Sequence, residues 1–308
     1  MVIVVGSLNM DLFIRVQRFL QPGETVIGED FHTAFGGKGA NQAYAIGKLG
    51  ALSNIATAMI GCVGPDSFGE QMIANLRTVG VDTRAVLRRE GVASGTALIT
   101  LDASGQNQIV VAPGANATLT AADVSAQLGL FQKAKAVVVQ LETTMPAVER
   151  ALRMAREAGA MTILNPAPAA SVPDELLRLC DYVIPNESEA RQLTGVGVLN
   201  VDAAAAAARI LRSRGARNAL VTLGDNGVWL ETEGFRGHVP AYRVKAVDTV
   251  GAGDTFIGGF VVGLIEGIDV RRAAQLGCAA SAIAVTRSGA QASVPMREET
   301  TEKLKSQN

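Results

Sequence analysis

The sequence predicts an α/β fold, with a doubly wound, mainly parallel central sheet flanked by helices and a small β-sheet lid. Short apolar runs alternate with alanine-rich segments of helical periodicity, and the runs are apolar on both faces, as in strands covered on both sides. The chain has 308 residues, 48% of them hydrophobic, which is enough to bury a large core. We therefore expect a single domain over residues 1–308.

Five apolar runs have the length and composition of buried strands: residues 2–5, 137–140, 161–164, 182–184 and 219–223. Helical segments separate most of them, for example residues 146–157 and 201–214. Because a strand, a helix and a second strand in succession form a right-handed crossover, we expect these strands to lie parallel in one sheet.

Two segments depart from this alternation, at about residues 11–35 and 93–113. In the first, Ile14 and Val16 alternate with polar residues, and in the second, strand-forming flanks surround a turn at residues 102–105. We expect the two insertions to form a small sheet that serves as a lid over a site or as a dimerisation surface. A hairpin without function is the alternative.

Charge and cysteine content favour a small-molecule partner. The 28 basic and 29 acidic residues leave a net charge of −1, which argues against binding to nucleic acid or an acidic membrane surface. Cys62, Cys180 and Cys278 are far apart and lack the spacing of a disulfide framework or a thiolate metal site. There is no basic leader, and no apolar run reaches the roughly 18 residues of a membrane span. We expect a soluble cytoplasmic protein with free thiols.

Polar residues follow several of the expected strands. Glu142 comes after the run at 137–140, Asn165 after the run at 161–164, and Asn186 after the run at 182–184. Thr222 and Gly224 stand at the end of the next strand. Ligands of open α/β sheets bind beyond the carboxyl ends of the strands, so we expect a binding site at this edge.

The stretch DTVGAGDTFIGG, residues 248–259, combines small residues with two carboxylates. Gly251, Ala252 and Gly253 leave backbone amides unobstructed, and the apolar spacing that follows predicts a helix beginning near Asp254. The free amides and dipole of a helix start favour a phosphate. Asp254 is then either an N-cap or the base that accepts a hydroxyl proton during phosphoryl transfer, and Asp248 suits a structural or cation-binding role.

A second glycine-rich stretch, FGGKGANQA, covers residues 35–43. It does not match the phosphate-binding loop GxxxxGK[ST], and the chain contains no GxGxxG dinucleotide fingerprint. The glycines allow close approach of a ligand, and Lys38 and Asn41 can form hydrogen bonds with hydroxyl groups. An ordinary turn at the start of a helix is the alternative.

Six motifs occur in an order that resembles the ribokinase-like carbohydrate kinase family over essentially the whole chain. They are GGKGANQA near the N-terminus, NPAPA at 165–169, PNESEA at 185–190, TLGDNG at 222–227, DTVGAGDTF at 248–256 and AVTRSGAQASVP at 284–295. The ordered set is far more specific than any one of its members.

The resemblance implies an activity and its cofactors. The expected reaction is ATP-dependent phosphorylation of D-ribose at its 5-hydroxyl, with Mg²⁺ on the nucleotide and K⁺ as an activator. The alternatives are another sugar or nucleoside kinase of the same family, or a sugar-binding regulatory protein without catalysis. We also expect a homodimer that forms through the β-sheet lid, because exposed edge strands are normally covered or paired.

The resemblance also assigns roles to individual residues. Asp254 matches the catalytic base, and the anion hole matches Gly251, Ala252 and Gly253. Besides Asp254, the sugar pocket matches Asn9, Asp11, Gly37, Lys38, Gly39, Asn41 and Glu142.

The implied nucleotide and cation sites use other residues. The ATP contacts match Asn186, Glu189, Thr222, Gly224, Gly227, Gly253 and Cys278, with Glu189 ordering magnesium through water and Cys278 at a position where family members vary. The monovalent cation site matches Asp248, Val250, Ala284, Arg287, Gly289 and Ser293. At Arg287 the implied ligand is the backbone carbonyl.

Overall fold

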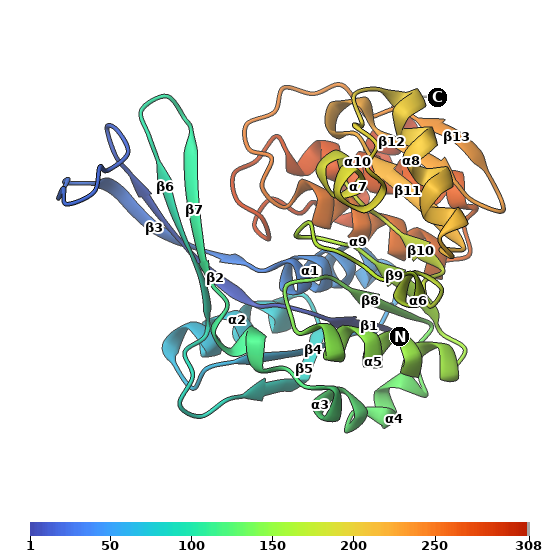
Figure 1. The fold of residues 1–308 in the computed structure, drawn as a ribbon, viewed down its shortest axis with the longest axis horizontal. Helices are drawn as coiled ribbons and strands as arrows, with labels where there is room; N and C mark the ends of the chain where they lie inside the picture. The colour runs from blue at the N-terminus through green and yellow to red at the C-terminus, as the bar shows by residue number, and fades with distance from the viewer. Residues whose placement is uncertain (307–308) are drawn as a thin grey trace.

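A nine-stranded sheet is the centre of the computed structural model, which describes residues 1–306. Its strand order is β13-β12-β11-β10-β9-β8-β1-β4-β5, and every pairing from β11 to β5 is parallel (Figure 1). The strands are β1 (Val2–Val5), β4 (Thr57–Val63), β5 (Val81–Arg88), β8 (Ala136–Val139), β9 (Met161–Leu164), β10 (Tyr182–Val183), β11 (Asn218–Thr222), β12 (Val228–Glu231) and β13 (Arg236–Val239). β12 and β13 extend the sheet by antiparallel pairing.

Helices cover both faces of this sheet because alternate residues of each strand point to opposite sides. Val2 and Val4 of β1 belong to one apolar core, and Ile3 and Val5 belong to the other. The first core includes buried residues of α1 (Lys38–Gly50), α2 (Ser67–Thr78), α9 (Ala252–Ile265) and α10 (Val270–Ala284). The second includes residues of α3 (Ala121–Ser125), α4 (Leu128–Phe131), α5 (Met145–Glu157), α6 (Asp174–Leu177), α7 (Glu187–Thr194) and α8 (Val201–Ser213).

The doubly wound, mainly parallel sheet predicted from the sequence is confirmed. Each of the five predicted apolar runs lies within one residue of an observed strand at both ends. The remaining helices are α11 (Arg297–Lys305) and three short 3-10 turns, η1 (Ala51–Ser53), η2 (Gly114–Thr118) and η3 (Gly224–Asn226). None of the helices within the described residues is long and apolar enough to span a membrane.

A separate four-stranded sheet projects from one side of the molecule (Figure 1). It consists of β3 (Glu29–Gly36), β2 (Asn9–Arg15), β6 (Gly95–Leu101) and β7 (Asn107–Ala112), in that order. β2 pairs parallel with β6, and the other two pairings are antiparallel. The small sheet that the sequence predicted is therefore present, and we call it the lid sheet. All six residues of β7 are exposed.

Candidate active site

The order of the strands reverses at β1, which has β4 on one side and β8 on the other. In doubly wound sheets, such a reversal opens a crevice at the carboxyl ends of the strands. Here Ser7, just after β1, donates a hydrogen bond to Glu142, just after β8, with 2.6 Å between the two oxygens. The same carboxylate accepts from the backbone N–H of Lys38 at 2.9 Å. Glu142 thus connects two strand ends to the start of α1.

Asp254 is the third residue of α9, whose N-cap is Gly251 in the left-handed conformation with φ of 73°. Its buried carboxylate accepts two side-chain hydrogen bonds from α1, at 2.9 Å from Asn41 Nδ2 and at 2.8 Å from Gln42 Nε2. The first turn of α9 has no side-chain cap. The interpretation of Asp254 as an N-cap is therefore wrong, because its carboxylate is turned toward α1.

The turn before Asp254 contains two glycines, and a side chain would clash with a neighbour at Gly251 but would meet empty space at Gly253. A side chain at Gly251 would lie 2.9 Å from Ala290, so the glycine allows the turn to pack on the loop that follows α10. A Cβ at Gly253 would meet nothing within 4 Å. Ala252 is the first helical residue. The open space at Gly253 leaves room for an anion at the start of the helix, where unpaired backbone amides favour negative charge.

Two buried polar residues of β2 lie on the lid side of the crevice. Asn9 accepts a hydrogen bond from Asn116 Nδ2 at 2.8 Å, and Asn116 also pairs with both backbone polar groups of Leu8. Asp11 is buried beside Gly36, where a Cβ would come within 2.2 Å of the carboxylate. Burial raises the pKa of Asp11 to about 7, and the nearby carboxylates of Glu142 and Asp254 add to the rise.

Gly37 and Gly39 pack directly against the backbone of another segment of the chain, which leaves no room for a side chain. Gly37 has φ of 83°, and a Cβ there would lie 2.7 Å from the backbone nitrogen of Asn9. At Gly39 the added atom would lie 2.5 Å from the backbone nitrogen of Ser7. Their Cβ positions are filled by the connection between β1 and β2, so packing alone already requires glycine there, and contact of their backbone with a ligand stays a prediction.

Lys38 is a half-buried cation among three acidic side chains. Burial lowers the pKa of its ammonium group, but the carboxylates of Asp254, Glu142 and Glu189 together raise it above the ordinary value. Burial raises the pKa of Asp254, while Lys38 and the amides of Asn41 and Gln42 oppose that rise. Lys38 therefore keeps its positive charge and favours the ionised form of Asp254.

Asn186 and Glu189 form a capping box at the start of α7. Asn186 Oδ1 accepts from the backbone N–H of Glu189 at 2.9 Å, and Glu189 Oε2 accepts from that of Asn186 at 2.8 Å. Burial raises the pKa of Glu189, and Lys38 is among the groups that lower it. Both residues thus have a structural function in the helix start, and Glu189 also lies within the electrostatic reach of Lys38.

The other predicted nucleotide residues lie at the end of β11 and on α10. Thr222 ends β11, and its backbone N–H donates to the carbonyl of Pro185. Gly224 begins η3, and Gly227 follows it with φ of 89°, where a Cβ would lie 2.1 Å from the carbonyl oxygen of Val239. Cys278 is a buried free thiol on α10, and burial raises its pKa to about 12.

The predicted monovalent cation site joins two loops. Asp248 accepts hydrogen bonds from the backbone N–H groups of Val250 at 3.0 Å and Gly289 at 2.8 Å. The guanidinium of Arg287 pairs with Glu299 of α11. Ala284 ends α10, and the Ser293 hydroxyl donates to the carbonyl of Ala290 at 2.8 Å. The side chain of Arg287 is thus directed away to α11.

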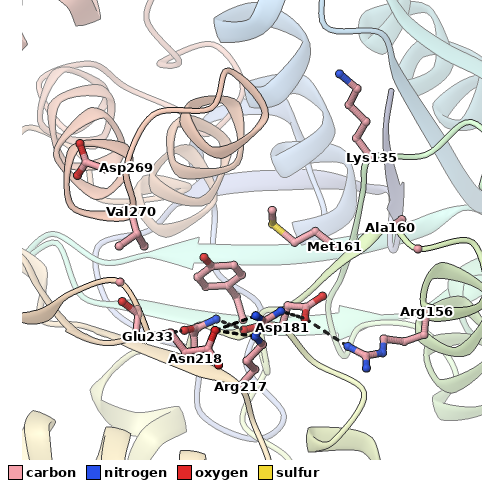
Figure 2. A pocket seen from close by; sticks show the side chains of 14 residues that line it. Lys135, Arg156, Ala160, Met161, Asp181, Arg217, Asn218, Glu233, Asp269 and Val270 are labelled. Atoms are coloured by element: carbon pink, nitrogen blue, oxygen red, sulfur yellow. Dashed lines mark hydrogen bonds and ion pairs between the residues drawn. The ribbon is translucent and has the colours of Figure 1, made fainter.

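A surface cavity of about 780 Å³ lies away from all these residues (Figure 2). It is lined by residues at the amino ends of β9, β10 and β11, including Met161, Tyr182 and Asn218. Asp181 occupies its floor, paired with Arg156 and Arg217. None of the site residues predicted from the sequence lines this cavity. Within the described residues, no group of three or more His, Cys, Asp or Glu side chains could hold a metal ion.

A family model described as pfkB family carbohydrate kinase matches residues 1–297 of this chain. The chain belongs to the pfkB family of carbohydrate kinases. It is 41% identical over 301 residues to a ribokinase from Haemophilus influenzae, an alignment that covers 98% of this chain and 97% of the relative. It is also 37% identical over 302 residues to a deoxyribokinase from Salmonella typhi, with 98% and 97% covered.

The fold of this pfkB kinase is also found among solved structures. The structure of Arabidopsis thaliana ribokinase complexed with ribose and ATP has a TM-score of 0.91 to this chain at 30% identity. The superposition covers 99% of this chain and 98% of the plant protein. The doubly wound sheet together with its lid sheet is therefore the fold of a carbohydrate kinase.

Sequence reasoning missed several polar residues that shape the site of this pfkB kinase. Four of them are Ser7, Gln42, Asn116 and Gln291, which contact Glu142, Asp254, Asn9 and Asn41 respectively. Gln42 had one available signal, since it is a polar residue inside a helix whose neighbours on the buried face are small or apolar. The other three stand in loops or short turns, where no periodicity marks a buried side chain.

Proposed function

We propose that this pfkB kinase transfers the γ-phosphoryl group of ATP to the 5-hydroxyl of D-ribose, giving D-ribose 5-phosphate and ADP. The observation that carries the proposal is the buried Asp254 carboxylate at the start of α9, held by Asn41 of α1 beside an open glycine. A base next to an anion-binding helix start suits phosphoryl transfer to a hydroxyl group. The similarity to H. influenzae ribokinase, and to A. thaliana ribokinase solved with ribose and ATP, supports ribose and ATP as substrates.

In the proposed reaction, Asp254 accepts the proton of the sugar hydroxyl as its oxygen attacks the γ-phosphorus. A new P–O bond forms, the bond to the bridging oxygen breaks, and ADP leaves with the electron pair. Lys38 and the backbone amides of Gly251, Ala252 and Gly253 would stabilise the negative charge on the phosphoryl oxygens. Of these amides, the N–H of Ala252 also donates to the carbonyl of Thr249 at 3.2 Å. The proton on Asp254 then passes to solvent after product release.

The sugar is held, in this proposal, by residues from β2, α1 and the end of β8. The carboxylate of Asp11, which accepts no hydrogen bond from another side chain or from the backbone among the described residues, would accept bonds from ring hydroxyls. The proposed contacts are Asn9, Asp11, Gly37, Lys38, Gly39, Asn41 and Glu142. Deoxyribose is the second candidate substrate because a relative that is 37% identical is named deoxyribokinase.

The nucleotide would lie along the ends of β10 and β11, over Asn186, Thr222, Gly224, Gly227 and Cys278. Magnesium in phosphoryl-transfer sites keeps several waters and binds mainly through phosphate oxygens. Glu189 fits that pattern, since it is a single buried carboxylate near Lys38 and belongs to no carboxylate cage in the described chain. We propose that Glu189 orders the waters of a nucleotide-bound Mg²⁺, which neutralises phosphate charge when present.

A K⁺ ion is proposed at the loops joined by Asp248. A carboxylate and backbone carbonyls are hard oxygen ligands suited to an alkali cation, and the site would use Asp248, Val250, Ala284, Arg287, Gly289 and Ser293. Because the Arg287 guanidinium is engaged with Glu299, this residue would contribute its carbonyl. Occupation of the site would stiffen the turn that leads into α9.

The lid sheet is proposed as the surface of a homodimer. The strand register places Leu12, Leu98 and Val110 side by side on one face, and Asp11 points to the opposite face. Leu98 is 52% exposed and Val110 is 64% exposed. A second lid sheet packed on this face would bury them.

We further propose a cytoplasmic location, because all three cysteines are free thiols, and we expect neither nucleic acid nor membrane as a partner.

A substrate panel tests the assignment. The purified chain is assayed with ATP, Mg²⁺ and K⁺ against D-ribose, 2-deoxyribose, fructose and adenosine. We expect the highest kcat/KM for D-ribose and a lower value for 2-deoxyribose, because a missing hydroxyl leaves a buried polar group unpaired. Preference for 2-deoxyribose would favour the second candidate, and binding of ribose without ADP formation would contradict a kinase function.

A further inference from the structure

Asp254 is contacted by two chains of buried amide side chains. In the first, Gln42 Nε2 donates to Asp254 Oδ1 at 2.8 Å and also to Asn165 Oδ1 at 3.0 Å. The other end of Gln42, Oε1, accepts from Gln140 Nε2 at 2.5 Å. Asn165 in turn donates through Nδ2 to the backbone carbonyl of Ile184 at 2.9 Å. Gln42 and Gln140 are fully buried.

The second chain reaches the other carboxylate oxygen. Asn41 Nδ2 donates to Asp254 Oδ2 at 2.9 Å, and Asn41 Oδ1 accepts from Gln291 Nε2 at 3.1 Å. Gln291 Oε1 accepts from Asn75 Nδ2 at 2.6 Å. Asn41 and Gln291 are buried, and Asn75 on α2 lies closer to the surface. In this chain every amide donates in the direction of Asp254.

The direction of the first chain is fixed by the backbone. The carbonyl of Ile184 can only accept, so the NH₂ group of Asn165 must face it, and Asn165 Oδ1 must face Gln42. Gln42 therefore presents its NH₂ group to both Asn165 and Asp254. Gln140 presents its own NH₂ group to Gln42, which leaves Gln140 Oε1 buried without a partner. A buried oxygen without a hydrogen bond costs free energy. The fixed direction of the chain places this cost on Oε1 of Gln140, the residue farthest from Ile184 along the chain.

We propose that Gln42 and Gln291 are positioning residues, which act through two amide chains to hold the Asp254 carboxylate in one orientation and in its ionised form. This inference rests on the proposed function of Asp254 as the base. Each carboxylate oxygen accepts one amide hydrogen bond and keeps further lone-pair capacity for the sugar hydroxyl. Amides linked in one direction polarise each other, which strengthens the final bond to the carboxylate.

A purely structural function for Gln42 predicts a different result. If Gln42 only filled space between α1 and α9, its loss would lower stability or lower kcat equally at every pH. If Gln42 keeps Asp254 ionised, its loss raises the pKa of Asp254. The acidic limb of the kcat profile, which reports the base in the substrate complex, then moves to higher pH.

The test is the kcat–pH profile of Gln42→Met, in which an unbranched apolar side chain replaces the amide. Loss of one hydrogen bond to a charged group is expected to move the acidic limb up by about one pH unit or more. The rate should recover toward the wild-type value above the new limb. Because Gln42 is fully buried and cannot touch substrate, KM for ribose and ATP should stay within about twofold of the wild type.

Gln140→Met and Gln291→Met keep the proposal testable if Gln42→Met does not fold. Gln140→Met leaves the Asp254 contact intact but removes the donor to Gln42 Oε1 and with it the polarisation of the Gln42 amide, so a smaller shift in the same direction is expected. Gln291→Met should shift the limb and also raise KM for ribose, because Asn41 loses its anchor. If every folded variant of the three keeps the wild-type limb, the proposal is overturned.

Two controls distinguish a failure of the positioning proposal from a failure of the proposed role of Asp254 as the base. Asn218→Leu removes a buried amide at the opposite end of the sheet, where it bonds to Asp181 and Glu233, and should lower the melting temperature without moving the limb. Asp254→Asn is assayed in parallel. Wild-type turnover by Asp254→Asn would contradict the proposed function of Asp254 as the base. If Asp254→Asn is inactive and Gln42→Met keeps the wild-type acidic limb, only the positioning proposal is contradicted.

Discussion

Asp248 and Gly289 join the turn before α9 to the loop after α10 by a hydrogen bond of 2.8 Å across 41 residues. The same loop packs Ala290 against Gly251, directly ahead of the proposed base. The loop after α10 is therefore in direct contact with the start of α9. A K⁺ ion at the proposed site beside Asp248 would therefore organise the turn ahead of Asp254 without touching ATP.

Potassium dependence follows from that relationship. At fixed Mg²⁺ and ionic strength, we expect turnover to rise with K⁺ and to stay low in a large inert cation of equal charge. Asp248→Ala should abolish the response, because it removes both a ligand and the bond to Gly289. Initial rates over a K⁺ titration provide the measurement. Equal rates of the wild type in both cations would contradict the proposed site.

Removal of the base is the second prediction. Asp254→Asn should lower kcat by about 10²-fold to 10⁴-fold, the range typical for loss of a general base, while ribose and ATP still bind. Asparagine has nearly the shape of aspartate but cannot take up the hydroxyl proton. Single-turnover kinetics and calorimetric binding are the measurements. A correctly folded variant with wild-type kcat would exclude this role for Asp254.

Ribose affinity should depend on pH through Asp11. Burial, Glu142 and Asp254 raise the pKa of this carboxyl to about 7, so it is largely protonated in the free protein below that pH. Ring hydroxyls donate to the ionised form. We therefore expect the dissociation constant for ribose to fall as pH rises from about 6 to about 8, as measured by titration calorimetry without nucleotide. An affinity that is flat over this range in the wild type would count against the prediction.

The same carboxyl should reduce stability at alkaline pH. In the unfolded chain Asp11 titrates near 3.8, so the folded state binds the extra proton between that value and about 7. The contribution of Asp11 to folding stability is complete below pH 3.8 and is lost as the pH rises through about 7. Asp11→Asn should therefore raise the melting temperature more at pH 8 than at pH 5, by about 2 °C or more at the higher pH, while ribose binding weakens. An equal change at both pH values would disprove the linkage.

Dimerisation through the lid sheet is tested on its exposed apolar face. Leu98→Lys places a charge between Leu12 and Val110 and should convert the dimer to a monomer at micromolar concentration, as measured by light scattering. Leu199→Lys is the matched control, because Leu199 is an equally large side chain that is 94% exposed and lies outside the lid sheet. A wild-type chain that is monomeric under the same conditions would refute the dimer.

The sequence by itself determined the doubly wound sheet and the beginning of α9. Runs such as VIVV at residues 2–5 are apolar on both faces, and only a strand covered on both sides accommodates them. The helix start near Asp254 was equally local, since the small residues before it and the apolar residues after it specify a helix beginning. These features depend on neighbouring residues, so periodicity and composition are sufficient to predict them.

Only the tertiary structure decided what surrounds each functional group. Gln42 meets Asp254 across 212 residues, and Gln291 meets Asn41 across 250 residues, because α1 packs against α9 and the loop after α10 closes over both. The raised pKa of Asp11 likewise results first from its burial in the fold, and then from Glu142 and Asp254, which other elements bring close to it. Hydrogen-bond direction and local dielectric are properties of such contacts, and no local pattern in the chain encodes them.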